Sequence, residues 1–297
     1  MEQMGHFNLV LLVLVWGSYY ISNRLALRTF SVTFTGVFIR LAVFFIMIIY
    51  MYLKKELKTL FKVENVFPRL VVIGLLGFLL DYTAFIGFKY STASKGSILL
   101  RSDVLFSTLI GIALGQRVNL SELLIVVTML FGVFLVSGQS LGDLSFQYGD
   151  MFFLLSALFI SLNAFVIRSV QTDKKNPVSD NVIAFYNNFF TLVFFLLFSG
   201  RNIKFSEFSG ISLNISFLGL LLASIFQFLI YVFYYYSLRR YPVWLVRSIL
   251  LLMPVYVSIF SVLFLKERLT FVQIVGMVII LCCAFMLTKI LYKSEVK

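Results

Sequence analysis

The sequence predicts an all-α integral membrane protein in which ten transmembrane helices form two inverted five-helix repeats. Three observations predict this fold class. Of the 297 residues, 61% are hydrophobic and 13% are charged, whereas a soluble domain is typically about half apolar and about a quarter charged. Apolar segments of about 20 residues, the length that crosses the hydrocarbon core, recur along the chain. The second half of the sequence also resembles the first.

The apolar segments are expected to be helices, because a lone strand leaves its backbone polar groups unsatisfied in lipid. Stretches rich in charged and turn-forming residues, such as "KKELKTLFKVENVFPR" and "TDKKNPVSD", separate them. The expected spans, in chain order, are 7–27, 33–53, 69–88, 96–115, 121–139, 147–167, 181–199, 212–236, 244–264 and 270–291.

The distribution of Lys and Arg between alternate loops predicts the orientation. With the N-terminus inside, the cytoplasmic segments hold Lys54, Lys55, Lys58, Lys62, Arg69, Arg117, Arg168, Lys174, Lys175, Arg239, Arg240, Lys289, Lys293 and Lys297. The outer loops hold fewer: Arg24, Arg28, Lys89, Lys95, Arg201, Lys204, Lys266 and Arg268. Cytoplasmic loops carry the excess of cations, so both termini are expected in the cytoplasm of a bacterial cell with this protein in its plasma membrane.

The charge distribution and the residue content argue against several classes of function. A net charge of +12 would indicate nucleic acid in a soluble protein, but here the cations fall in short loops, so no nucleic acid partner is expected. His6 is the only histidine, and Cys282 and Cys283 lie inside the last apolar segment. No GxxxxGK[ST] loop is present. The sequence therefore predicts no metal, no cofactor and no enzymatic activity.

An internal repeat is the most informative feature. A shift of 151 residues places "FKYSTASKGSILLRSDVLFSTLIGIALGQRV" over "RRYPVWLVRSILLLMPVYVSIFSVLFLKERL" without a gap, so that Asp103 aligns with Pro254 and Gly96 with Arg247. The predicted repeats are 1–139 and 140–297. Five spans in each repeat give the two repeats opposite orientations, which is typical of secondary transporters with a substrate site near the middle of the bilayer.

The sequence resembles the EamA-type branch of the drug/metabolite transporter superfamily over nearly its whole length. The resemblance rests on "WGSYYISNRLALR", "LKERLTFVQIVGMVII" and, most specifically, "MPVYVSIFSVLFLKERLT". It implies a bundle around a central cavity, alternating access, and export or uptake of amino acids or other small metabolites by a monomer or weak homodimer. One departure concerns the usual proline of the signature, which is Pro254 in the second repeat but Asp103 in the first.

Four charged residues lie inside the predicted spans at a similar depth. At 1.5 Å per residue, Arg40, Asp81, Arg101 and Asp103 lie roughly 10 Å below the outer edge. Buried charges face the bundle interior and pair with one another. On a regular helix, Arg101 and Asp103 point about 200° apart, so one is expected to pair with Asp81 or Arg40 and the other to face the cavity. The alternative is a neutral network that only fixes helix packing.

These charges suggest substrate chemistry. An arginine would hold a carboxylate or phosphate in a forked pair, and an aspartate could bind an ammonium or carry a coupling proton. Arg247, at the inner end of the ninth span, is a further candidate, although snorkelling to the cytoplasmic face would also explain it. Asn163 and Asn187 are candidates for substrate contact, or else for interhelical hydrogen bonds worth about 0.6 kcal/mol each.

The aromatic residues divide into two groups. Trp16, Tyr19 and Tyr234 are expected to line the cavity, where their rings could cover an apolar or cationic substrate. Tyr235 and Tyr236 are expected to be interfacial anchors near the cytoplasmic edge.

The predicted function is that of a secondary active transporter, an exporter of a small polar metabolite such as an amino acid. Its partners would be the substrate, membrane lipids and a coupling proton. One alternative is an importer or exchanger of S-adenosylmethionine or of an organic anion. An alternative of another class is a membrane-embedded lipid-modifying enzyme using Asp81 and Asp103, which both lie too deep for a site at the lipid–water interface.

Overall fold

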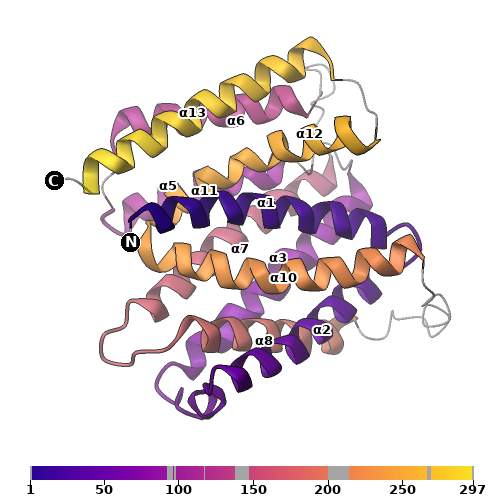
Figure 1. Cartoon of the computed structure of the whole chain (residues 1–297), viewed down its shortest axis with the longest axis vertical. Coiled ribbons are helices and arrows are strands. Elements are labelled where there is room, and N and C mark those ends of the chain that lie inside the picture. Colours follow the sequence, from indigo (N-terminus) through magenta and orange to yellow (C-terminus); the bar gives the residue numbers. More distant parts are fainter. Residues whose placement is uncertain are drawn as a thin grey trace. The chain divides into compact units, whose positions relative to one another are not determined.

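The computed structural model describes residues 2–91, 96, 98–116, 118–137, 147–199, 214–265 and 269–295, and these residues contain helices and no strand (Figure 1). Each of the ten expected segments contains helix. The α-helices are α1 (Glu2–Ala26), α2 (Val32–Leu53), α3 (Phe67–Tyr90), α5 (Asp103–Ala113), α6 (Leu120–Val136), α7 (Tyr148–Gln171), α8 (Asp180–Ser199), α10 (Ile215–Arg240), α11 (Val243–Ile249), α12 (Met253–Leu265) and α13 (Phe271–Glu295). Three 3₁₀ turns accompany them: η1 (Leu57–Phe61), η2 (Leu100–Ser102) and η5 (Leu250–Leu252).

Many of these helices are apolar enough to cross a membrane. Within the described residues, six segments meet the requirements of length and composition: Thr33–Leu53, Phe67–Ala84, Tyr148–Gln171, Asp180–Phe198, Ile215–Arg240 and Val243–Phe260. Three shorter apolar helices are Phe7–Asn23, Leu120–Val136 and Phe271–Leu287. The all-helical membrane class is therefore confirmed, and the count of ten crossings stays a prediction.

The chain divides into two compact units. The first unit comprises Met1–Asp81 and Leu162–Arg240, and the second comprises Tyr82–Ser161 and Tyr241–Lys297. The division falls inside α3 and α7, so each unit takes helices from both predicted repeats.

In the first unit, α1 packs along α10, and α2 packs against α8 and α10. The approach of α1 to α10 depends on Gly219, because a Cβ there would lie 2.8 Å from the backbone oxygen of Ser22 and from the backbone nitrogen of Ala26. Small residues let membrane helices approach this closely.

In the second unit, α6 packs against α13, and α5 packs against α11. Two glycines face each other between α6 and α13: a Cβ on Gly276 would lie 2.7 Å from the Gly132 oxygen, and a Cβ on Gly132 would lie 3.0 Å from the Gly276 oxygen. Any side chain at either position would meet rigid backbone, so the pair sets the distance between the two helices.

Two spans of the second unit are interrupted by a 3₁₀ turn at nearly matching repeat positions. Between α11 and α12, Pro254 has no N–H to donate to the Leu250 carbonyl, and that carbonyl accepts a hydrogen bond from the Met253 N–H instead. The span at 96–115 is interrupted at η2 with no proline, where the Asp103 N–H donates to the Leu100 carbonyl. The expectation of a regular helix through Arg101 and Asp103 is therefore wrong.

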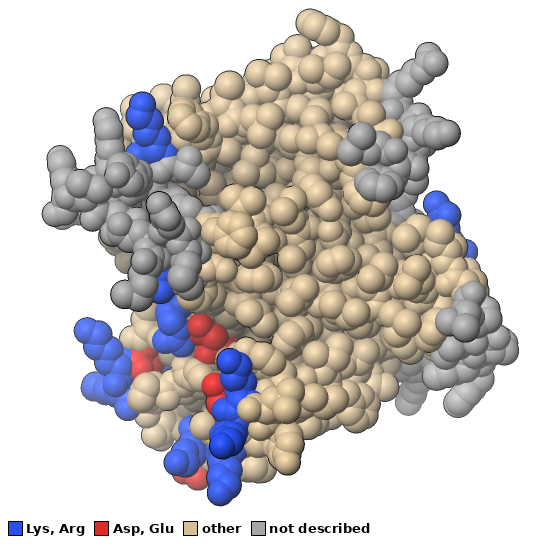
Figure 2. Space-filling model, viewed as in Figure 1, with Lys and Arg blue, Asp and Glu red and all other residues tan. Residues whose placement is uncertain are grey.

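Basic residues gather at one end of the first unit, around the 54–66 and 172–179 loops and the C-terminus of α10. They are Lys54, Lys55, Lys58, Lys62, Arg69, Lys174, Lys175, Arg239 and Arg240. Figure 2 shows blue and red side chains together at the lower left of the molecule. Other cations of the orientation count lie outside the described residues or have undescribed side chains (Arg24, Lys89, Lys95, Arg117, Arg201, Lys204, Lys266, Arg268, Lys293 and Lys297). The orientation stays a prediction.

Candidate functional site

An ion pair between a buried arginine and a half-buried aspartate joins α2 to α3 in the first unit. Arg40 Nη2 lies 3.0 Å from Asp81 Oδ2, and Arg40 Nη1 donates to the Tyr231 hydroxyl on α10. Asn188 Nδ2 on α8 donates to the Arg40 carbonyl over 2.9 Å. Four helices therefore converge on this arginine, which is 9% exposed, and the pair leaves neither charge uncompensated.

Aromatic side chains pack beside this pair. The Trp16 and Tyr234 rings meet edge to face with centroids 5.2 Å apart. Tyr19 lies half-buried, within electrostatic reach of both Arg40 and Asp81. The predicted aromatic residues of α1 and α10 therefore lie in one unit with the Arg40–Asp81 pair.

Tyr235 corrects an expectation. It is 1% exposed, its hydroxyl accepts a hydrogen bond from Asn187 Nδ2 over 2.7 Å, and its carbonyl accepts one from Gln171 Nε2 over 2.9 Å. It is a buried packing residue and no interfacial anchor. Its neighbour Tyr236 is half-buried and carries the Arg240 guanidinium 4.5 Å from its ring centroid.

Both candidate asparagines make interhelical hydrogen bonds. Asn163 Nδ2 on α7 donates to the Ile73 carbonyl on α3 over 2.7 Å. Asn187 bonds Tyr235 and also accepts from the Thr191 hydroxyl over 3.4 Å. These contacts match the packing alternative, and a substrate contact for either amide stays a prediction.

A second ion pair lies deep inside the second unit. Arg247 Nη2 on α11 donates to Asp103 Oδ2, the carboxylate at the start of α5. Asp103 is 1% exposed and Arg247 is 3% exposed. The other carboxylate oxygen, Asp103 Oδ1, has no hydrogen-bond partner within the described part of the chain. The Ser161 hydroxyl fixes the local backbone by donating to the Asp103 carbonyl over 2.7 Å.

The Asp103–Arg247 pair differs from the ion-pair partners that the sequence predicted. Arg247 does not snorkel to the cytoplasmic face, because it is buried on a carboxylate. Arg40 and Asp81 pair with each other, and Arg247 is the partner of Asp103 that the sequence reasoning missed. The repeat alignment placed Arg247 opposite Gly96 and so gave no signal. A stronger signal was Asp103 itself, which occupies the position of a helix-breaking proline.

Arg101 lies in η2, half-buried. It belongs with Asp103 to the second unit, whereas Arg40 and Asp81 belong to the first. The predicted common layer of these four charges stays a prediction. Among the described residues, no group of three His, Cys, Asp or Glu side chains could hold a metal ion.

Two Arg–Asp ion pairs lie within the apolar helices, one in each unit. Each Arg–Asp pair is electrically neutral as a whole, yet it presents a forked donor and an anionic acceptor inside an apolar bundle. The combination of apolar helices, buried charge pairs and interrupted spans defines the class as a multi-pass membrane protein with a transporter-like fold.

Comparison with known proteins gives the family. The sequence profile of the EamA-like transporter family matches residues 3–138 and 147–289, so the chain belongs to that family and the resemblance inferred from its motifs is confirmed. A solved structure described as "Crystal structure of protein" has a TM-score of 0.78 at 14% identity and covers 99% of both chains, which shows a shared fold. No curated protein matches the sequence.

Proposed function

We propose that the protein is a secondary active transporter that exports a small polar metabolite, such as an amino acid, by alternating access. It would lie in a bacterial plasma membrane with both termini in the cytoplasm. The proposed repeats, 1–139 and 140–297, are supported by the two separate family matches at 3–138 and 147–289. A monomer or weak homodimer suffices for this mechanism.

The observation that carries the proposal is the buried Asp103–Arg247 pair beside a helix interruption. Removing one member of such a pair would leave an uncompensated charge in the bundle. A zwitterion avoids this cost, because its carboxylate can replace Asp103 on Arg247 while its ammonium, or a coupling proton, neutralises Asp103. Asp103 Oδ1, which has no hydrogen-bond partner within the described residues, would accept the ammonium or the proton once the bundle opens. Transporters commonly place their sites at interrupted helices.

The remaining candidates have supporting roles in this proposal. Arg101 precedes Asp103 by two residues and offers a second cation for an anionic group. Trp16, Tyr19 and Tyr234 belong to the first unit, and they stay candidates for contact with the apolar part of a substrate. Asp81 is held by Arg40 on a guanidinium that also bonds Tyr231, so this pair serves packing first.

The lipid-modifying alternative receives no support from this geometry. Such an enzyme would need Asp81 and Asp103 as an acid and a base. Each carboxylate is instead held by its own arginine, and the two belong to different units.

The proposal is tested by counterflow in proteoliposomes loaded with unlabelled amino acids and supplied with labelled ones. Wild type is expected to accumulate label for at least one amino acid, and Asp103→Asn and Arg247→Gln are expected to lose the accumulation. Asp173→Asn removes a half-buried carboxylate in a loop that is also paired with an arginine, and it should retain transport. Accumulation of only S-adenosylmethionine or an organic anion would replace the proposed substrate. Unchanged counterflow in both buried variants would overturn the proposed site.

A further inference from the structure

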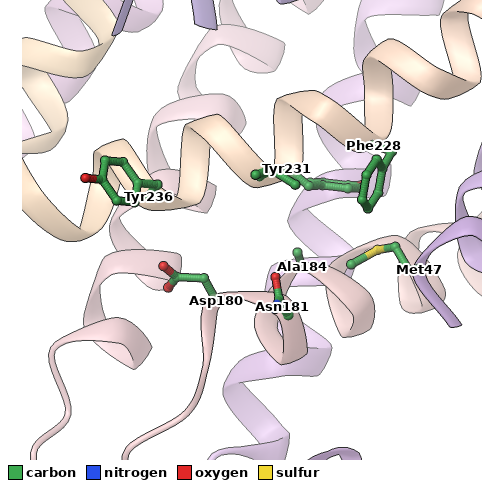
Figure 3. A pocket seen from close by; sticks show the side chains of 8 residues that line it. Met47, Asp180, Asn181, Ala184, Phe228, Tyr231 and Tyr236 are labelled. Carbon is green, nitrogen blue, oxygen red and sulfur yellow. The ribbon is translucent and has the colours of Figure 1, made fainter. Parts of the chain in front are cut away.

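A groove of about 270 Å³ lies in the first unit, lined by residues from α2, α8 and α10 (Figure 3). Phe228, Tyr231, Val232 and Tyr236 come from α10; Asp180, Asn181 and Ala184 come from α8 across from it; and Met47 comes from α2. The volume is just below the roughly 300 Å³ at which pockets hold a whole drug-sized molecule. The groove is therefore large enough for part of a ligand and too small for a whole lipid.

The groove lies beside an exposed apolar stripe of α10. Leu218, Leu221 and Ile225 form an exposed apolar stripe on α10 and are 52%, 40% and 48% exposed. Phe228, Val232 and Tyr236 continue that stripe at spacings of three and four residues, which places them on the same side of the helix. In a membrane-spanning helix an exposed apolar stripe faces the acyl chains. The groove thus opens sideways, toward the bilayer.

Apolar and aromatic groups form the floor of the groove and one of its walls. Met47 is 2% exposed and Ala184 is 3% exposed, so both are fixed in the packed interior of the unit. The Phe228 ring is held by Tyr50 of α2, with centroids 5.2 Å apart. This part of the groove suits a hydrocarbon chain.

The polar end of the groove carries charges of both signs. Asp180 Oδ1 accepts hydrogen bonds from Arg239 Nη2 over 2.7 Å and from Gln171 Nε2 over 2.8 Å. Asp180 and Arg239 form an ion pair through this oxygen, and no described residue donates a hydrogen bond to Asp180 Oδ2. Arg240 lies over the ring of Tyr236, which lines the groove. One acceptor for an ammonium therefore lies in the same groove as a ring that carries a cation, and this cation pairs with no anion in the described part of the chain.

The position of this end along the helices fits a lipid headgroup. α8 begins at Asp180 and α10 ends at Arg240, so the polar groups lie at the membrane–water interface while Phe228 lies two to three turns deeper. By the positive-inside rule, the gathered Lys and Arg residues favour the cytoplasmic side of the membrane for this end of the first unit.

We propose that this groove binds a phosphatidylethanolamine molecule of the inner leaflet. The primary ammonium of the headgroup donates to Asp180 Oδ2, the phosphate lies against Arg240, and the first part of one acyl chain packs along Val232 and Phe228. An anionic glycerol headgroup would leave Asp180 unmatched. A choline headgroup has no N–H to donate to the carboxylate, so it forfeits the charge-assisted hydrogen bond.

The test is native mass spectrometry of the delipidated full-length protein, titrated separately with phosphatidylethanolamine, phosphatidylcholine and phosphatidylglycerol of the same acyl chains. For the first lipid bound, wild type is expected to prefer the ethanolamine lipid by roughly tenfold, the factor that one charge-assisted hydrogen bond contributes. Asp180→Asn is expected to abolish that preference. Asp173→Asn, which changes a carboxylate outside the groove, should leave it intact.

A second variant keeps the test decisive if Asp180→Asn does not fold. Val232→Trp fills the lipid-facing part of the groove without touching its charges, and it should weaken the first binding event for all three lipids. Equal affinities for the three lipids in wild type, or a preference that survives in both groove variants, would overturn the proposal. Displacement of the lipid by soluble glycerophosphoethanolamine at equal concentration would show that a free headgroup is the ligand and would also overturn it. The readout is bound lipid, so it does not depend on the transport substrate.

Discussion

The Asp103–Arg247 pair gives the sharpest prediction about stability. Arg247→Gln leaves the Asp103 carboxylate, 1% exposed, without its cation, and breaking a buried pair in this way costs about 3–5 kcal/mol. At about 2–4 °C per kcal/mol for a chain of this size class, the melting temperature is expected to fall by roughly 6–20 °C. Water cannot solvate the unpaired carboxylate, because both side chains of the pair are almost completely buried.

The assay is a double-mutant cycle read by thermal unfolding of the detergent-purified protein. Asp103→Asn and Arg247→Gln are each expected to lower the midpoint. The combined variant should be more stable than the sum of the two losses predicts, since it buries no net charge. Transport is measured on the same four proteins: wild type, the two single variants and the combined variant. If the combined variant folds but does not transport, the two charges are needed for transport and not only for stability.

Strict additivity of the two single losses would refute the reasoning, since residues that share one ion pair must couple. Losses no larger than that of Arg69→Gln, which breaks the half-exposed pair with Asp173, would refute it as well. That exposed pair is the control for a general effect of removing an arginine, because exposed pairs contribute little.

Three further outcomes are expected from particular contacts. Gly276→Leu is expected to abolish folding, because its Cβ would lie 2.7 Å from the Gly132 oxygen, and normal expression with a monodisperse elution profile would contradict this. Gly36→Ala is expected to stabilise α2 by about 0.5–1 kcal/mol, since the nearest atoms lie 3.9 Å away; a lowered melting midpoint would contradict it. The Arg69 guanidinium lowers the pKa of Asp173 to about 2. The stabilisation from this pair is therefore full above about pH 4 and lost as the pH falls toward 2, so the midpoint difference between wild type and Arg69→Gln should shrink over that range and not at neutral pH.

The sequence predicted the helices well because lipid imposes a strong local rule. A stretch of about 20 apolar residues must be helical in a bilayer, so the expected segments and the described helices agree closely. The segment expected at 181–199, for example, became α8 at Asp180–Ser199. The sequence did not predict the interruption at Leu100–Ser102, because no proline or glycine marks it. The ion-pair partner of the adjacent Asp103 is Arg247, which lies 144 residues away along the chain.

The side-chain partners were harder to predict, because they also depend on residues that are far apart along the chain. Depth counting assigned Arg40 and Asp81 to one level, and these two do pair. It could not assign Arg247 to Asp103, because a depth counted from a predicted helix end is only as accurate as that end. The two residues also lie on spans that are predicted to enter from opposite faces. Tyr235 was misread for a related reason: nearness to a helix end does not say which face of the helix a ring occupies.

The two interrupted spans differ in whether the interruption can be undone. At Pro254 the ring removes the amide hydrogen permanently, so the Leu250 carbonyl can never regain a bond from that residue. In the first repeat every amide from Leu100 to Val104 is present, and nothing covalent prevents the turn from rewinding as α-helix. Rewinding three residues would shorten the segment by about 1.5 Å and rotate α5 about its axis by about 60°. The second repeat thus contains a permanent interruption of its helix, whereas the interruption in the first repeat is reversible and lies beside the charge of Asp103.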